Sequence, residues 1–552
     1  MQPRLRGALV LLPLLACAAA HPPPVAGHPG TWADLVALFA EWRAFQKPRL
    51  VEGVPDYTPA AMSAQERELG TFQRRLLALE PGGWPIPQQV DFHLVRAEMN
   101  GLEFDHRVLQ PWARNPAFYV TVFDEESDQP AREGPFALGA VELWKYPAPL
   151  DAAAAAEVTA GLRPIPALLL QARGNLTGNA RDLWNFGIRA VQQERGILAK
   201  LGARSTGQPA LQEAAQRALS ATDDYLRWLQ EQAPAKTGPS GVGIANYDWY
   251  LEHVQLMPYT WADEVALVQR ELARATSALA QEEQKNRGLP EQVPVGSAAE
   301  YQQRFNAGVT EYMEFLKARE VVTIRPEMEP ALRDHIGAYT EKRPLEFFAE
   351  ADYRDPEIMR THGYHWIDLA RMRTEPQASP IRRGALLYNI FNSRTEGFAT
   401  AMEELMMNAG MCEARPRSRE LIYVLLAQRG ARALGELHLH ANTRSLEEAA
   451  RETSALTPRG WLRTSGATLW FEQHLFLQQP GYGTSYVLGK QEIDKLISAR
   501  AAQLGKDFTL RRFMDEKDAA GLIPVSLLRW ELTGNSEDVP GVGWPRRQER
   551  SH

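Results

Sequence analysis

Residues 31–45, Thr-Trp-Ala-Asp-Leu-Val-Ala-Leu-Phe-Ala-Glu-Trp-Arg-Ala-Phe, show the pattern that decides the fold. Apolar side chains stand at positions 32, 35, 38, 39, 42 and 45, so that they are separated by three or four residues. This is the periodicity of an amphipathic α-helix with one buried face. The same spacing recurs through most of the chain, whereas the alternation of a large sheet is not found and only short runs such as 118–123 favour a strand. We therefore predict a mostly α fold with little β structure.

The periodicity also gives the expected boundaries of the elements. Thr260 is the expected N-cap of a long helix with acidic residues in its first turn, and Arg287-Gly-Leu-Pro is expected to end it. The Pro- and Gly-rich segments 235–244 and 289–296 are expected to be loops, but neither is long enough to separate independent domains. Helices are predicted at 60–80, 86–104, 150–172, 179–203, 208–233, 260–287, 298–319, 328–342, 385–411, 417–441, 445–455, 467–479 and 485–504.

We expect one large helical domain at 31–533, with the chemically informative part at 350–530 and a polar tail at 534–552. The composition agrees, because 552 residues with 44% hydrophobic and 23% charged residues can bury a sizeable core. The 61 basic and 68 acidic residues are interspersed and give no electrostatic reason to expect nucleic acid as a partner. The sequence does not indicate an oligomeric state.

The N-terminus predicts export. Arg4 and Arg6 precede the apolar run 8–15, which is too short to span a bilayer and is typical of a signal peptide at 1–20. The segment 14–17, Leu-Leu-Ala-Cys, resembles a bacterial lipobox, in which Cys17 becomes the lipidated first residue; ordinary cleavage after Ala20 is the alternative. Residues 21–30 form a Pro-rich linker. We expect a protein of the periplasm or cell envelope, an outer-membrane lipoprotein if Cys17 is modified, that contacts a membrane only through that anchor.

Either form of processing removes Cys17 from the folding problem, so the mature domain keeps only Cys412. A single cysteine cannot form an intramolecular disulfide, so packing must hold the fold together. A thiol nucleophile would need a positioned histidine, and we expect Cys412 to be a buried structural residue.

The candidate chemistry lies in two segments, 362–365 (His-Gly-Tyr-His) and 394–405 (Arg-Thr-Glu-Gly-Phe-Ala-Thr-Ala-Met-Glu-Glu-Leu). His362 and His365 have the i, i+3 spacing of one helical face, and Glu396 on a neighbouring helix would complete the ligand set of a zinc ion. No glutamate follows either histidine, so the acid/base residue of an H-E-x-x-H site is absent. The alternatives are histidines without metal, and a buried Glu396 carboxylate paired with Arg394 or Arg432.

The order of several motifs resembles the family of bacterial, often exported, proteins known as domain of unknown function 885, which is similar in layout to helical zinc metallopeptidases. The family's E-G-W-A corresponds to 396–399, Glu-Gly-Phe-Ala; its helix R-x-x-x-D-x-G-x-H corresponds to 432–440; and its P-G-Q-A-x-x-Y-x-x-G-Q corresponds to 480–490. The segments 241–251 and 510–528 are also similar to the family, so that the resemblance runs from about residue 30 to 533 and is specific after residue 385.

The family's hallmark, H-E-x-x-P-G-H-H, is degraded in this chain. Aligning its G-H-H with 363–365 places Ile358 and Met359 where His and Glu should be, and the other register places Gly363 at the glutamate. Glu357 and Asp368 are the nearest carboxylates, but neither has the family position. By resemblance, Arg432, His440 and Tyr486 are expected to line the cleft, where they would stabilise an oxyanion or hold a substrate carboxylate. For Tyr486 the alternative is a core tyrosine, and His438 is expected to face elsewhere.

These observations lead to three hypotheses. The first is a zincin-like protein with a degenerate metal site that binds a peptide or small ligand in the remaining cleft. The second is an active zinc-dependent peptidase or hydrolase with the variant ligands His362, His365 and Glu396. The third is a non-enzymatic envelope scaffold. The sequence contains no G-x-S-x-G elbow, P-loop or dinucleotide-binding fingerprint that would indicate another class of enzyme.

Overall fold

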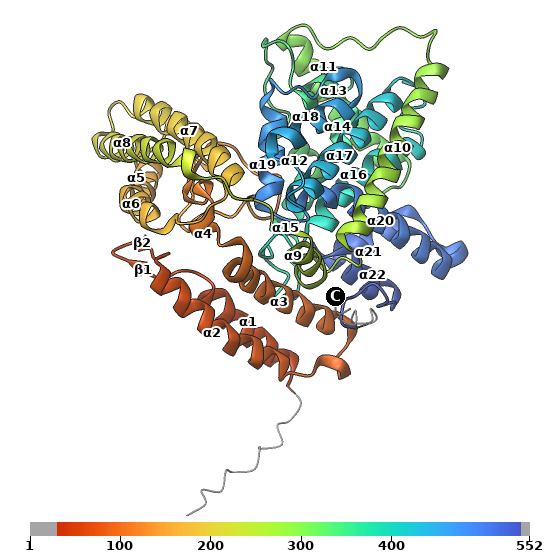
Figure 1. The fold of residues 1–552 in the computed structure, drawn as a ribbon. Coiled ribbons are helices and arrows are strands. Elements are labelled where there is room, and N and C mark those ends of the chain that lie inside the picture. Colours follow the sequence, from red (N-terminus) through yellow and green to blue (C-terminus); the bar gives the residue numbers. More distant parts are fainter. Residues whose placement is uncertain (1–29, 543–552) are drawn as a thin grey trace, which may run out of the picture.

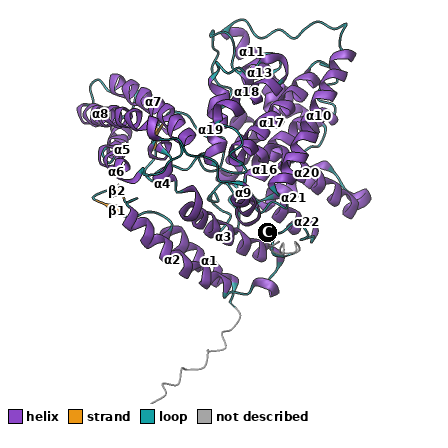
Figure 2. Cartoon of the chain, viewed as in Figure 1, coloured by secondary structure: helices purple, strands orange, loops and turns teal. Residues whose placement is uncertain are grey.

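The computed structural model describes residues 30–542. The predicted signal peptide, Cys17, most of the Pro-rich linker and the end of the tail lie outside the described residues. Within them, nearly all regular structure is helical (Figure 2), and the strands are two pairs of two-residue segments. The prediction of a mostly α fold in one large domain is confirmed.

The elements follow one another along the chain in the order of Figure 1. The helices of the first half are α1 (Trp32–Phe45), α2 (Pro59–Leu77), α3 (Ile86–Phe104), α4 (Pro111–Arg114), α5 (Ala152–Leu162), α6 (Ile165–Asn175), α7 (Arg181–Arg204), α8 (Pro209–Gln232), α9 (Ile244–Tyr250) and α10 (Trp261–Lys285). Those of the second half are α11 (Ala298–Ala318), α12 (Met328–Arg333), α13 (Phe347–Asp352), α14 (Pro356–His362), α15 (Tyr364–Thr374), α16 (Asn392–Asn408), α17 (Ser418–His440), α18 (Leu446–Leu456), α19 (Ala467–Gln478), α20 (Tyr482–Leu504), α21 (Leu510–Ala520) and α22 (Val525–Thr533). The strands are β1 (Leu50–Val51), β2 (Val54–Pro55), β3 (Val122–Phe123) and β4 (Val141–Glu142).

Local chemistry explains several helix ends. Thr260 caps α10 as predicted, and its hydroxyl accepts from the amide of Asp263 while the Asp263 carboxylate accepts from the amide of Thr260. The predicted helix 385–411 begins only at residue 392, because Tyr388 and Asn389 both have positive φ. The predicted strand at 118–123 is only partly correct, since residues 116–119 form a 3-10 turn and only β3 is extended.

The helices form one main body with a lateral lobe. Helices α5 to α8 form the lobe on the left in Figure 1, with its own apolar core, while α1 to α3 lie below the main body. Helix α17 is buried along almost its whole length and is the central element of the main body. A smaller apolar cluster, which includes Phe186 of α7 and Leu477 of α19, joins the lobe to the body.

The segment Ala152–Asn175 is long and apolar enough to be compared with a membrane span, by length and composition alone. In the structure it is divided into α5 and α6, each 11 residues long. Each helix is therefore only about 16 Å long, and both pack against α8 in the lobe. The segment is thus part of a helical lobe in this fold.

The crossing of α16 and α20 positions the site. Gly397 and Gly489 meet there with their backbones in contact, and a Cβ on Gly397 would lie 2.4 Å from the Cα of Gly489. A side chain at either position would separate the helices, so the two glycines permit this close approach. Because Glu396 precedes Gly397 and Tyr486 lies one turn before Gly489, the crossing brings chemically active side chains of both helices to one place.

Candidate metal centre

Three potential metal ligands converge between α14, α15 and α16. His362 ends α14, Gly363 breaks the helix, and His365 lies in the first turn of α15, so the two histidines do not share one continuous helical face as predicted. Glu396 lies in the first turns of α16. Its Oε2 atom is 3.3 Å from His365 Nε2 and 3.9 Å from His362 Nε2. One ligand atom from each of the three residues lies within 4.8 Å of the other two.

The outward atoms of Glu396 and His365 are held by neighbouring side chains. Glu396 Oε1 accepts hydrogen bonds from the Tyr482 hydroxyl at 2.8 Å and from the Gln129 amide nitrogen at 2.9 Å. The same amide nitrogen lies 3.4 Å from His365 Nδ1, and the Gln129 carbonyl accepts from the Thr395 hydroxyl at 2.8 Å. The inward atoms, His365 Nε2 and Glu396 Oε2, are buried and face each other at 3.3 Å, and neither has a hydrogen-bond partner outside this pair. A cation held by the three residues would lie between these inward atoms.

His362 is fixed from its other side. Its Nδ1 atom lies 3.2 Å from Arg429 Nη2 and 3.2 Å from Glu403 Oε1. Arg429 and Glu403 form a bidentate ion pair in which both side chains are fully buried. This pair sets the ring of His362 with Nε2 toward Glu396.

The charges around the ligands are unbalanced. Burial alone would raise the pKa of Glu396, but His365, His362 and the hydroxyl of Tyr482 lower it to about 2. Burial would lower the pKa of His365, but the carboxylates of Asp128 and Glu396 raise it to about 9. Burial, with repulsion from Asp128, raises the pKa of Glu133 to about 7. Within residues 30–542, no arginine or lysine forms a salt bridge with Glu396, Asp128 or Glu133, so three carboxyl groups gather here against the imidazoles of His365 and His362.

Two of the three predicted cleft residues adjoin this site. The Tyr486 ring lies parallel to the His362 ring with centroids 6.4 Å apart, and the Arg432 guanidinium lies 4.1 Å from the centroid of the same tyrosine ring. His440 lies two turns beyond Arg432 on α17, about 12 Å along the axis, where its Nε2 donates to the Phe476 carbonyl at 3.0 Å. Burial lowers the pKa of His440 to about 4. The structure thus places His440 away from the cluster.

The predicted alternative partners of Glu396 are engaged elsewhere. Arg394 binds Asp368 and Asp518, with nitrogen–oxygen distances of 3.1 and 3.2 Å. Arg432 forms a buried ion pair with Glu472. The alternative in which Glu396 pairs with an arginine is therefore wrong for this structure. The Asp368 carboxylate forms its ion pair with Arg394. Cys412 is buried and free, as expected, and burial raises its pKa to about 12.

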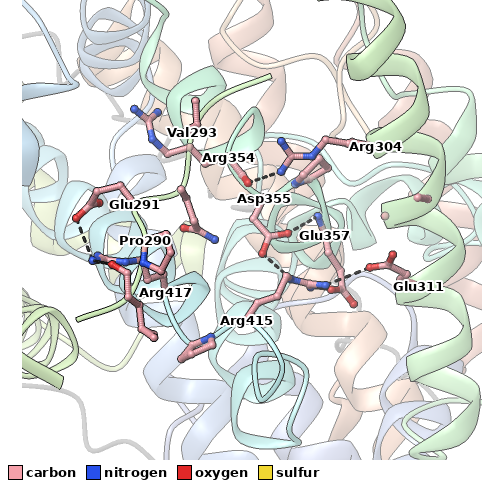
Figure 3. A pocket seen from close by; sticks show the side chains of 16 residues that line it. Pro290, Glu291, Val293, Arg304, Glu311, Arg354, Asp355, Glu357, Arg415 and Arg417 are labelled. Carbon is pink, nitrogen blue, oxygen red and sulfur yellow. Dashed lines mark hydrogen bonds and ion pairs between the residues drawn. The ribbon is translucent and has the colours of Figure 1, made fainter. Parts of the chain in front are cut away.

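A cavity of about 690 Å³ opens at the other end of α14 (Figure 3). Its charged side chains neutralise one another, since Arg415 contacts Asp355, Glu311 and Glu357, and Arg417 contacts Glu291. Glu357 thus starts α14 while His362 ends it, and Glu357 points into this cavity and not toward the ligands. Another cavity, of about 250 Å³, is lined by Pro130, the residue after Gln129, and by Asp368.

The three candidate ligands predicted from the sequence converge in the structure, but the sequence did not predict the residues that contact them. Gln129 and Asp128 lie in a loop more than 200 residues before His365, and a single glutamine in a polar segment gives no signal of its own. Tyr482 lies within the motif at 480–490, but no role is predicted for it. Its position four residues before Tyr486, on the same helical face, was the signal that could have found it.

Comparisons with known proteins agree with the fold. Residues 365–532 match the family described as "Bacterial protein of unknown function (DUF885)". No curated protein matches the chain. Two solved structures, each described as a "putative lipoprotein", are similar to it. The Shewanella oneidensis protein, of unknown function, is 18% identical with a TM-score of 0.62, and the match covers 90% of this chain and 97% of that one. The Colwellia psychrerythraea protein is 13% identical with a TM-score of 0.61, and the match covers 92% and 99%. At these identities the likeness concerns the fold.

Proposed function

We propose that this chain is an exported metal-dependent hydrolase that holds one zinc ion with His362, His365 and Glu396 and acts on peptide or related amide bonds. The observation that supports it best is the convergence of three ligand atoms within 4.8 Å, two of which, His365 Nε2 and Glu396 Oε2, are buried and have no hydrogen-bond partner outside the cluster. Two histidines and one glutamate are a ligand set of zinc hydrolases, in which a fourth position stays open. The N-terminal signal pattern and the description of both structural relatives as lipoproteins support a place in the cell envelope.

The residues around the ligands suit this chemistry. A bound zinc ion would lower the pKa of a water molecule and polarise a substrate carbonyl. Tyr482 and Gln129 orient the Glu396 carboxylate, and the Arg429–Glu403 pair orients His362. Arg432 and Tyr486 lie beside His362, where a guanidinium and a phenol would bind the oxygen atoms of a substrate. Glu133, with a pKa raised to about 7 by burial and Asp128, is suited to exchange a proton near neutral pH.

A metal-free binding protein is the second candidate, and the absent glutamate on α14 favours it. Met359 and Gly363 stand where the two alignments require the catalytic carboxylate. Without metal, the imidazolium of His365 is stabilised by Asp128 and Glu396, so the site can also exist as a buried charge cluster. In that case the site would bind a peptide or small ligand without hydrolysing it.

Metal content separates the two candidates. The mature protein would be exchanged against a weak chelator and its zinc measured by plasma mass spectrometry. We expect about one zinc per chain, lost in His365→Ala and Glu396→Gln but kept in the matched control His438→Ala, because the partner of the His438 ring is Thr443, outside the cluster. A wild-type protein that retains no stoichiometric metal would contradict the proposal and favour the metal-free binding protein. A peptide library would then be screened for cleavage by the zinc-loaded protein, with Glu396→Gln as the inactive control.

A further inference from the structure

The loop between β3 and β4, residues 124–139, covers the metal centre with one inserted side chain. Gln129 is only 3% exposed, although most of its neighbours in the loop are half-buried or exposed. The loop is tied down beside the site as well, since Glu126 Oε2 lies 3.1 Å from His335 Nε2 and the Ser127 hydroxyl donates to Glu133 at 2.6 Å. Gln129 is therefore held in place by the site and by the loop around it.

The orientation of the Gln129 amide follows from its partners. The ionised Glu396 carboxylate can only accept hydrogen bonds, so the amide nitrogen, and not its oxygen, must face Glu396 Oε1 at 2.9 Å. The same nitrogen faces His365 Nδ1 at 3.4 Å and Asp128 Oδ1 at 3.2 Å. An amide N–H group cannot accept a hydrogen bond, so in this arrangement Gln129 gives His365 Nδ1 no acceptor.

A metal ligand needs the opposite arrangement. When the Nε2 atom of a histidine binds a metal, its Nδ1–H group donates to a carboxylate, a carbonyl or water, and this outer bond fixes the ring. The acceptor is already present at the site. The Asp128 carboxylate accepts from the same Gln129 amide nitrogen that faces His365 Nδ1, so a carboxylate lies beside the outer edge of the His365 ring.

We propose that Asp128 is the positioning residue for His365, whose Nδ1–H group donates to the Asp128 carboxylate when the site is loaded. The amide N–H group of Gln129 stays on Glu396 and does not compete for this bond. This inference rests on the proposed function, because it concerns the zinc ion held by His362, His365 and Glu396. The loop would thus supply the carboxylate that orients a ligand, from a segment far from the histidines in sequence.

The test is the zinc affinity of the full mature protein, measured by competition with a chromophoric chelator. Asp128→Ala removes the acceptor and is expected to weaken zinc binding 10- to 100-fold. Gln129→Met keeps the size of the side chain without the N–H donor to Glu396, and is expected to weaken zinc binding less than Asp128→Ala does, because the Tyr482 hydroxyl still orients that carboxylate. Glu125→Ala, on an exposed position of the same loop, is the matched control and should change nothing.

Asp128→Ala must weaken zinc binding more than Gln129→Met and Glu125→Ala do, which a general loosening of the loop would not produce. If all three weaken zinc binding equally, or if Asp128→Ala binds zinc like the wild type, the inference is overturned while the proposed function stands. If the wild type itself has no zinc affinity, the proposed function fails and the inference falls with it. The thermal midpoint of each metal-free variant shows whether it folds. Should Asp128→Ala fail to fold, Asp128→Asn takes its place with an expected loss of about threefold to tenfold, since an amide oxygen accepts more weakly than a carboxylate.

Discussion

Replacing Gly397 by alanine would test whether the contact between α16 and α20 builds the site. An added Cβ would lie 2.4 Å from both the Cα and the carbonyl carbon of Gly489, and 2.9 Å from the amide nitrogen of Lys490. Carbon atoms in van der Waals contact are about 3.5–4.0 Å apart, so the helices must separate by about 1 Å. No side-chain rotation can relieve this clash, since all three atoms belong to the backbone. We expect the variant to lose about 3 kcal/mol of unfolding free energy, the upper end of the cost of overpacking.

Urea unfolding of the metal-free protein measures this loss. Gly196→Ala in α7 is the matched control, because no atom lies within 4 Å of the added Cβ and the residue is helical. The control should be as stable as the wild type or gain about 0.5–1 kcal/mol. The separation of α16 from α20 should also lengthen the 2.8 Å hydrogen bond between Tyr482 and Glu396 and weaken zinc binding. A Gly397→Ala protein as stable as the control would refute the argument that the glycine pair sets the helix separation.

Two further substitutions test the buried charges of the main body. Glu264 and Glu436 both lie at hydrogen-bond distance from the Tyr247 hydroxyl. Burial is the largest cause that raises the pKa of each carboxyl group to about 8, and neighbouring groups contribute less. The stability that these groups contribute is therefore present below about pH 4.5 and is lost as pH rises to about 8. Glu264→Gln should therefore stabilise the protein relative to the wild type more at pH 8 than at pH 5, by on the order of 2 kcal/mol of unfolding free energy. The thermal midpoints at the two pH values measure this difference, and an equal change at both would contradict the assignment. Arg394→Met leaves the buried Asp368 carboxylate without its ion-pair partner and should cost about 3–5 kcal/mol in urea unfolding; a loss below about 1 kcal/mol would show that the carboxylate finds another partner.

The sequence predicted the fold well where one face of a helix is buried for many residues. Helices α8, α10 and α11 begin and end within two residues of their predicted limits, because apolar spacing marks all three and side-chain N-caps begin α10 and α11. Prediction failed where short elements and tertiary contacts decide the backbone. The segment 347–374 forms three short helices, separated at Asp355 and at Gly363, and none of them is long enough to show a periodic pattern.

The ligands could be predicted from residue type, but their geometry could not. An i, i+3 pair of histidines was expected to share one face, yet Gly363 separates them and the two rings still converge because α14 and α15 meet at an angle around Glu396. The packing between α16 and α20 was not visible either, since the glycines of the two motifs are 92 positions apart. What the sequence lacks in each case is the tertiary neighbour that fixes the side chain.

The match to the bacterial family begins at residue 365 and so includes His365, Glu396 and Tyr482 but not His362 or Gln129. His362 and the loop at 124–139 therefore lie outside the matched segment, although their side chains meet Glu396 and His365 in space. An incomplete sequence motif and an inactive site are different propositions, because a ligand set is defined by which atoms meet in space. If zinc binds, the site draws on a helix end and a distant loop that no contiguous motif contains, and a glutamate missing from the sequence pattern does not decide against hydrolysis.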